Sequence, residues 1–77
     1  MFFLIEYERT GGKLITFRKF DDVERGSAEN ARLEIELELN RRGVKREVVL
    51  LDAETEAALR RTHRRYFENL TELVTTP

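Results

Sequence analysis

The chain has 77 residues, no cysteine and one histidine, and its 14 Lys and Arg nearly balance its 15 Asp and Glu, for a formal net charge of −1. This length predicts one small domain over residues 1–77, with a tail at 74–77; such domains bury only about 60% of their unfolded surface, so a partner often adds stability. The composition excludes disulfides, thiolate metal sites and a multi-histidine metal site within one chain, and the balanced charge gives no overall basic field to attract nucleic acid. We therefore expect no cofactor.

No apolar run approaches the roughly 20 residues of a membrane span. The apolar start, residues 1–5, is too short for a signal peptide and has no basic residue before it. We expect a cytoplasmic protein without membrane contact.

The N-terminal third predicts a β-hairpin. Phe2–Glu8 and Lys13–Phe20 are rich in aromatic and β-branched residues, and the glycines of the intervening Thr10–Gly12 can take the positive φ that hairpin turns need. Strict alternation divides the side chains between two faces: Phe3, Ile5, Tyr7 on one face of the first strand and Phe2, Leu4, Glu6, Glu8 on the other, and Ile15, Phe17 on one face of the second strand and Leu14, Thr16, Arg18, Phe20 on the other.

A helix is predicted between the hairpin and Gly43. Asp21 can cap its start, with Glu24 three residues later in a capping-box arrangement, although Gly26 costs about 1 kcal/mol inside a helix and favours a start near Ser27. Gly43 supplies the stop.

Residues Leu33–Leu39 leave helix or strand open. Apolar and acidic residues alternate strictly, as in a strand, whereas Leu and Glu favour a helix. As a helix, the segment places Leu33 and Leu37 opposite the stripe formed by Ala28, Ala31, Ile35 and Leu39. These two leucines then either form a second apolar face or are ordinary exposed side chains.

A third strand and a second helix complete the pattern. Glu47–Leu51 reads as a buried strand with apolar residues on both faces. Thr55 is the expected cap of a helix reaching Val74. Its apolar stripe would contain Leu59, His63, Tyr66, Leu70 and Leu73.

The predicted fold class is α+β, β-β-α-β-α, with a three-stranded sheet in order 2-1-3 and two helices on one face. A right-handed crossover makes the third strand parallel to the second. The other sheet face would expose Phe2, Leu4 and Leu14, a larger apolar patch than most monomers leave open. Together with Leu33 and Leu37, these residues are the candidate self-association surface.

His63 is the first candidate for chemistry, as the only side chain that normally titrates near neutrality. Three roles stay open: a packed imidazole, a general base or ligand, and a pH-sensitive contact.

Six arginines are the second candidate, a basic patch for phosphates or nucleic acid: Arg41, Arg42, Arg60, Arg61, Arg64 and Arg65. Ordinary helix ion pairs are the simpler interpretation, since Glu56–Arg60 and Arg64–Glu68 have i,i+4 spacing.

The strand Val48–Ala53 followed by Thr55–His63 resembles the strand-to-helix unit of ferredoxin-like dimeric α+β barrel proteins. The resemblance covers about a third of the chain, which has three evident strands in place of four. It implies sheet-mediated pairing and assigns no functional residues.

Three functions follow as expectations. The first is a small non-catalytic protein-interaction domain acting as a homodimer or with a protein partner. The alternatives are a nucleic-acid-binding accessory protein using the arginine-rich last helix, and a small-ligand-binding barrel around His63.

Overall fold

A computed structural model of the chain describes residues 1–68. Its elements follow the predicted order. They are β1 (Phe2–Glu8), β2 (Lys13–Phe20), the short 3-10 helix η1 (Asp22–Glu24), α1 (Arg25–Arg42), β3 (Glu47–Asp52), α2 (Glu56–Thr62) and the 3-10 helix η2 (Arg64–Tyr66).

The three strands form one sheet in the order β2-β1-β3, which confirms the predicted α+β fold and strand order. β1 pairs antiparallel with both neighbours, so β3 runs parallel to β2 as expected. Phe2 lies opposite Phe20 on one side and opposite Asp52 on the other.

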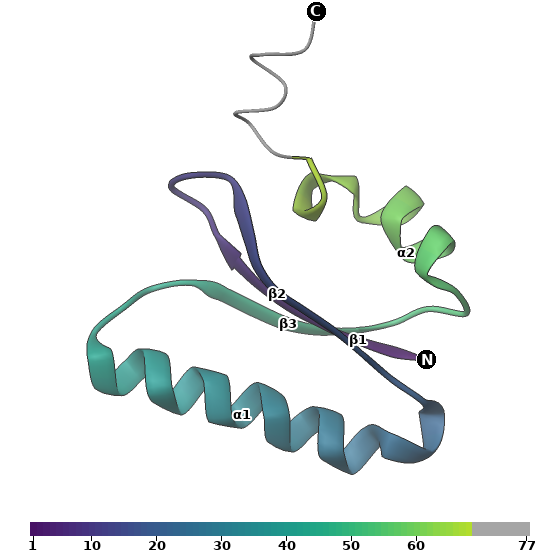
Figure 1. Cartoon of the computed structure of the whole chain (residues 1–77), viewed down its shortest axis with the longest axis horizontal. Coiled ribbons are helices and arrows are strands. Elements are labelled where there is room, and N and C mark those ends of the chain that lie inside the picture. Colours follow the sequence, from purple (N-terminus) through teal and green to yellow (C-terminus); the bar gives the residue numbers. More distant parts are fainter. Residues whose placement is uncertain (69–77) are drawn as a thin grey trace, which may run out of the picture.

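The helices lie on opposite faces of the sheet, and the prediction that they share one face is wrong. Figure 1 shows the sheet edge-on between α1 and α2. Phe3, Ile5 and Tyr7 of β1 pack with Leu59 of α2, whereas Leu4 packs with residues of α1. Because β1 is apolar on both faces, each face needs its own cover, and the expected open apolar face is absent from residues 1–68.

A β-bulge in β2 changes the predicted division of its side chains. Glu6 pairs with Thr16 but the next residue, Tyr7, pairs with Leu14, so Ile15 is the extra residue. Since a bulge shifts the alternation by one position, Leu14 joins Phe17 in the cluster beneath α2. The prediction that Leu14 lies on the opposite face from Phe17 is therefore wrong.

The segment Leu33–Leu39 is helical, as its composition favoured. α1 begins at Arg25, directly after η1, and includes Gly26. The Glu24 carboxylate accepts a hydrogen bond of 3.0 Å from the backbone N–H of Asp21, the expected capping-box contact. Gly43 ends the helix at φ 69°, a left-handed conformation that favours glycine.

The second helix is shorter than predicted. Thr55 caps it as expected, accepting a bond of 3.0 Å from the Ala58 N–H, but α2 ends at Thr62. The Thr62 hydroxyl donates to the Ala58 carbonyl at 3.0 Å, and His63 leaves helical geometry at φ −125°, ψ 50°. η2 then buries Tyr66 edge-on against Tyr7, with ring centroids 5.3 Å apart.

The remainder of the predicted helix, including Leu70, Leu73 and Val74, lies outside the described residues.

The position of α1 over Leu4 predicts a contrast between two leucines. Leu4→Ala should lower the free energy of unfolding by about 2–5 kcal/mol, because Leu4 is fully buried. Leu33→Ala should change it by about 0.5 kcal/mol or less, since Leu33 is 51% exposed. Urea denaturation at one fixed protein concentration measures both; similar losses for the two variants would contradict the placement of α1.

Candidate interaction surface

The two edges of the sheet differ in how well they are protected against pairing with another strand. β2 carries a bulge and the charged side chains of Lys13, Arg18 and Lys19, which are common devices against edge pairing. β3 has continuous pairing with β1 and four successive apolar residues, Val48 to Leu51. All four are partly exposed, although helices cover both faces of the sheet.

The backbone of β3 presents alternate residues to its open edge. The N–H of Ala53 donates to the carbonyl of Met1 at 3.0 Å, which places this pair in the hydrogen-bonded positions of the antiparallel ladder. Hydrogen-bonded and non-hydrogen-bonded pairs alternate along such a ladder, so Glu47, Val49 and Leu51 face β1. The N–H and C=O groups of Val48, Leu50 and Asp52 therefore point away from β1, and no strand within residues 1–68 pairs with them.

A polar cluster fixes the start of β3 to η2. The Glu47 carboxylate accepts hydrogen bonds from Arg9 at 3.0 Å, from Arg65 at 2.6 Å and from the Tyr66 hydroxyl. Arg65 also lies over the Tyr66 ring, 4.2 Å from its centroid. These contacts account for the position of η2 at this end of the sheet.

The same contacts shift two pKa values in opposite directions. Desolvation acts to raise the pKa of Glu47, but the hydrogen bonds from Tyr66, Arg65 and Arg9 outweigh it and lower the pKa to about 2. Burial and the hydrogen bond to Glu47 raise the pKa of Tyr66 to about 12. At neutral pH the pair is a carboxylate and a neutral phenol, which suits a structural contact.

A second ion pair lies beneath α1. Glu6 is buried in the central strand and accepts hydrogen bonds from Arg46 at 2.7 Å and Thr16 at 2.8 Å. The Arg46 Nε is buried without a hydrogen-bond partner among the described residues. A buried carboxylate needs such a partner to remain charged, so Arg46 fixes the loop before β3 to the centre of the sheet.

The candidate self-association residues lie in three different environments. Leu4 is fully buried under α1, with Phe2 partly buried beside it, and Leu14 lies partly buried under α2. Leu33 and Leu37 are 51% and 59% exposed on the outer side of α1. Only these last two offer apolar surface of the kind the sequence predicted.

The six arginines do not form one patch. Arg41 and Arg42 end α1 on one side of the sheet, and the other four belong to α2 and η2 on the opposite side (Figure 1). Both predicted helix ion pairs form, Arg60–Glu56 at 2.9 Å and Arg64–Glu68 at 3.6 Å. Arg41 likewise pairs with Glu38.

His63 has the surroundings of a packed side chain. Its ring stacks on Tyr66 with centroids 6.3 Å apart, and its Nδ1 lies 2.9 Å from the Thr62 hydroxyl. Within residues 1–68 no carboxylate forms an ion pair with it.

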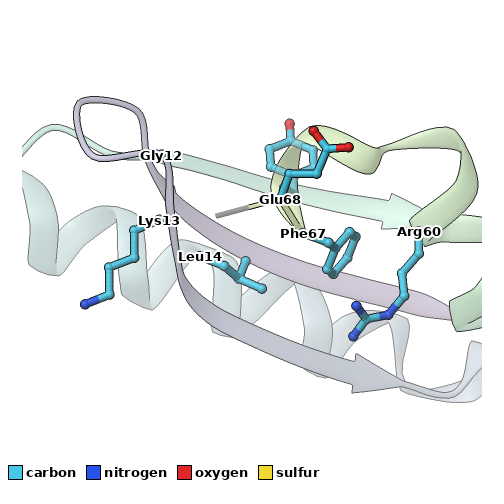
Figure 2. A pocket seen from close by; sticks show the side chains of 7 residues that line it. Gly12, Lys13, Leu14, Arg60, Phe67 and Glu68 are labelled. Atoms are coloured by element: carbon cyan, nitrogen blue, oxygen red, sulfur yellow. The ribbon is translucent and has the colours of Figure 1, made fainter. Parts of the chain in front are cut away.

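A pocket of about 240 Å³ lies between the start of β2 and η2 (Figure 2). The Phe67 ring stands between Leu14 and Arg60, and the Lys13 side chain points away from them. The Arg60 guanidinium lies 4.4 Å from the centroid of Phe67 and pairs with Glu56. Because the Arg60 guanidinium is already held by these contacts and the Lys13 side chain points away, the pocket offers little to a ligand.

Among the described residues, no group of three or more His, Asp or Glu is placed to hold a metal ion. None of the helices described is both long and apolar enough to cross a membrane. Comparison of the chain with protein-family models, curated proteins and solved structures gave no match.

Sequence reasoning missed the β3 edge and both polar clusters. The predicted order 2-1-3 already made the third strand an edge, yet its apolar run was interpreted only as burial on both faces. A signal for the inner cluster was also present, because strict alternation places Glu6 on the same face as Leu4.

The low pKa of Glu47 predicts how stability depends on pH. Because the folded-state pKa lies below the unfolded value of about 4.5, Glu47 stabilises the fold above that pH, and this contribution is lost as the pH falls toward about 2. Glu47→Gln should therefore lower the free energy of unfolding by roughly 1–3 kcal/mol at pH 7 and by much less at pH 2.

Chemical denaturation across this pH range measures the difference, with the exposed Glu34→Gln as control. A Glu47→Gln deficit that stays constant from pH 7 to pH 2 would contradict the assignment.

Proposed function

We propose that this chain is a non-catalytic protein-interaction domain that associates with a second copy of itself. One observation carries the proposal: β3 is an edge strand without a bulge, and it is apolar from Val48 to Leu51 between its charged ends. An uninterrupted edge of this kind is a template for another strand.

The energetics support association. Removing about 300 Å² of apolar surface from water at about 25 cal/mol per Å² contributes several kcal/mol. The stability of natural domains is itself only about 5–15 kcal/mol, and a 77-residue domain lies toward the lower end of that range. A pairing that buries apolar area of this size would therefore matter for both assembly and folding.

The state of the polar groups supports a role without catalysis. His63 is stacked on Tyr66, Glu47 is neutralised by two arginines, and the Glu6 carboxylate is paired with Arg46. Each of these groups is engaged in holding elements together. The split of the arginines between two sides of the sheet also gives less support to nucleic-acid binding.

Light scattering across a dilution series tests the proposal on the full-length chain. We expect the mass to approach twice 9.1 kDa at high micromolar concentration and to fall toward the monomer on dilution, because pairing is a bimolecular equilibrium. A monomer over the whole range would contradict self-association.

A parallel titration with single-stranded and duplex DNA at low salt should show little binding.

A further inference from the structure

We infer that two copies pair antiparallel through their β3 edges, with Leu50 of each on the two-fold axis, so that the two sheets become one. This inference rests on the proposed self-association and specifies its surface and register. It assigns the interface to β3 and not to the exposed leucines of α1.

The backbone determines which registers are available. Only Val48, Leu50 and Asp52 present N–H and C=O groups outward, so a partner strand must place its own outward residues opposite them. With Leu50 opposite the partner's Leu50, all three outward residues of β3 find such a position, Val48 lying opposite the partner's Asp52. The result is about six hydrogen bonds across the interface, since each hydrogen-bonded pair exchanges two. If the partner strand is shifted by two residues in either direction, one of Val48, Leu50 and Asp52 lies opposite a residue outside β3.

The side chains suit this register. Leu50 lies opposite the partner's Leu50 on the side of α1, where Leu50, Val48 and Ile35 pack against the same buried cluster. Val49 lies opposite the partner's Leu51 on the side of α2, where both belong to the cluster around Leu59. Apolar residues thus meet across the axis on both faces, the arrangement that stabilises neighbouring strands.

The charges at the two ends of β3 are complementary under the same symmetry. Lys45 precedes the strand and Glu54 follows it, and both are exposed, whereas Arg46 and Glu56 are held in ion pairs within one copy. Antiparallel pairing with Leu50 on the axis places Lys45 opposite the partner's Thr55, so the exposed Lys45 of one copy lies next to the exposed Glu54 of the other. A parallel arrangement would place like charges together, so charge favours the antiparallel one.

A single introduced cysteine tests the register, because the chain has none of its own. Leu50→Cys should form a covalent dimer under mild oxidation, since the Cα atoms of a hydrogen-bonded antiparallel pair lie about 5.5 Å apart, within disulfide range. The matched control is Ile15→Cys on the β2 edge, also a partly exposed apolar strand residue. We expect at least about tenfold more covalent dimer for Leu50→Cys, with circular dichroism confirming that both variants fold.

The outcomes separate this inference from the proposed function. If the wild type dimerises in light scattering but Leu50→Cys cross-links no better than Ile15→Cys, the β3 register is wrong and self-association stands. If Leu37→Glu abolishes the dimer, the interface is the outer side of α1. A wild type that is monomeric at every concentration overturns both proposals.

Charge reversal gives a second test that leaves the core untouched, because Lys45 and Glu54 are both exposed. Lys45→Glu and Glu54→Lys should each raise the dimer dissociation constant by about tenfold, as each puts like charges together twice in a symmetric dimer. The double variant should restore most of the affinity, and Lys13→Glu on the other edge should have little effect. Failure of the double variant to recover would contradict the antiparallel arrangement.

Discussion

Burial of β1 on both faces is the constraint from which the rest of the structure follows. Every residue from Phe3 to Tyr7 is buried, and the alternation of side chains sends apolar groups in both directions. One helix cannot cover two faces, so α1 covers the face of Leu4 and α2 the face of Phe3 and Ile5. Because both faces of the sheet are covered within residues 1–68, the sheet itself can meet another chain only at its edges.

The two edges of the sheet differ in charge and regularity, so they are not equally suited to pairing with another strand. β2 is bent by a bulge and carries positive charge, whereas β3 is regular and apolar between Glu47 and Asp52. The buried pair of Glu6 and Arg46 and the cluster around Glu47 hold the start of β3 in place. An edge fixed in this way loses less conformational entropy on pairing than a mobile one.

Local patterns predicted the elements well but predicted their environment less well. Turn glycines, helix caps and the alternation in Phe2–Glu8 predict the hairpin, the stop at Gly43 and the cap at Thr55, and all of these are confirmed. The capping box at Asp21 opens η1, and α1 begins at Arg25 and not near Ser27. The prediction that both helices share one sheet face is wrong, because the face that a helix covers depends on packing between segments distant in the sequence. Hydrophobic periodicity does not report the bulge at Ile15, which changes the strand register by one residue. It also does not report the end of α2 at Thr62, where the hydroxyl bonds back to the Ala58 carbonyl.

The candidate surface shows the same division. The helical pattern places Leu33 and Leu37 opposite the apolar stripe, and both are exposed. The prediction that both helices share one face leaves Leu4 on an open face, whereas α1 covers it. Identifying the outward groups of β3 requires the strand order and also which of its residues bond to β1. The hydrogen bond from Ala53 to Met1 supplies the second of these.

Amide hydrogen exchange in β3 tests the central claim most directly. At high protein concentration, the outward amides of Val48, Leu50 and Asp52 should be protected, and dilution to the monomer should release them while Val49 and Leu51, bonded to β1, stay protected. Rapid exchange of the three outward amides at concentrations where the protein is dimeric would contradict pairing at β3.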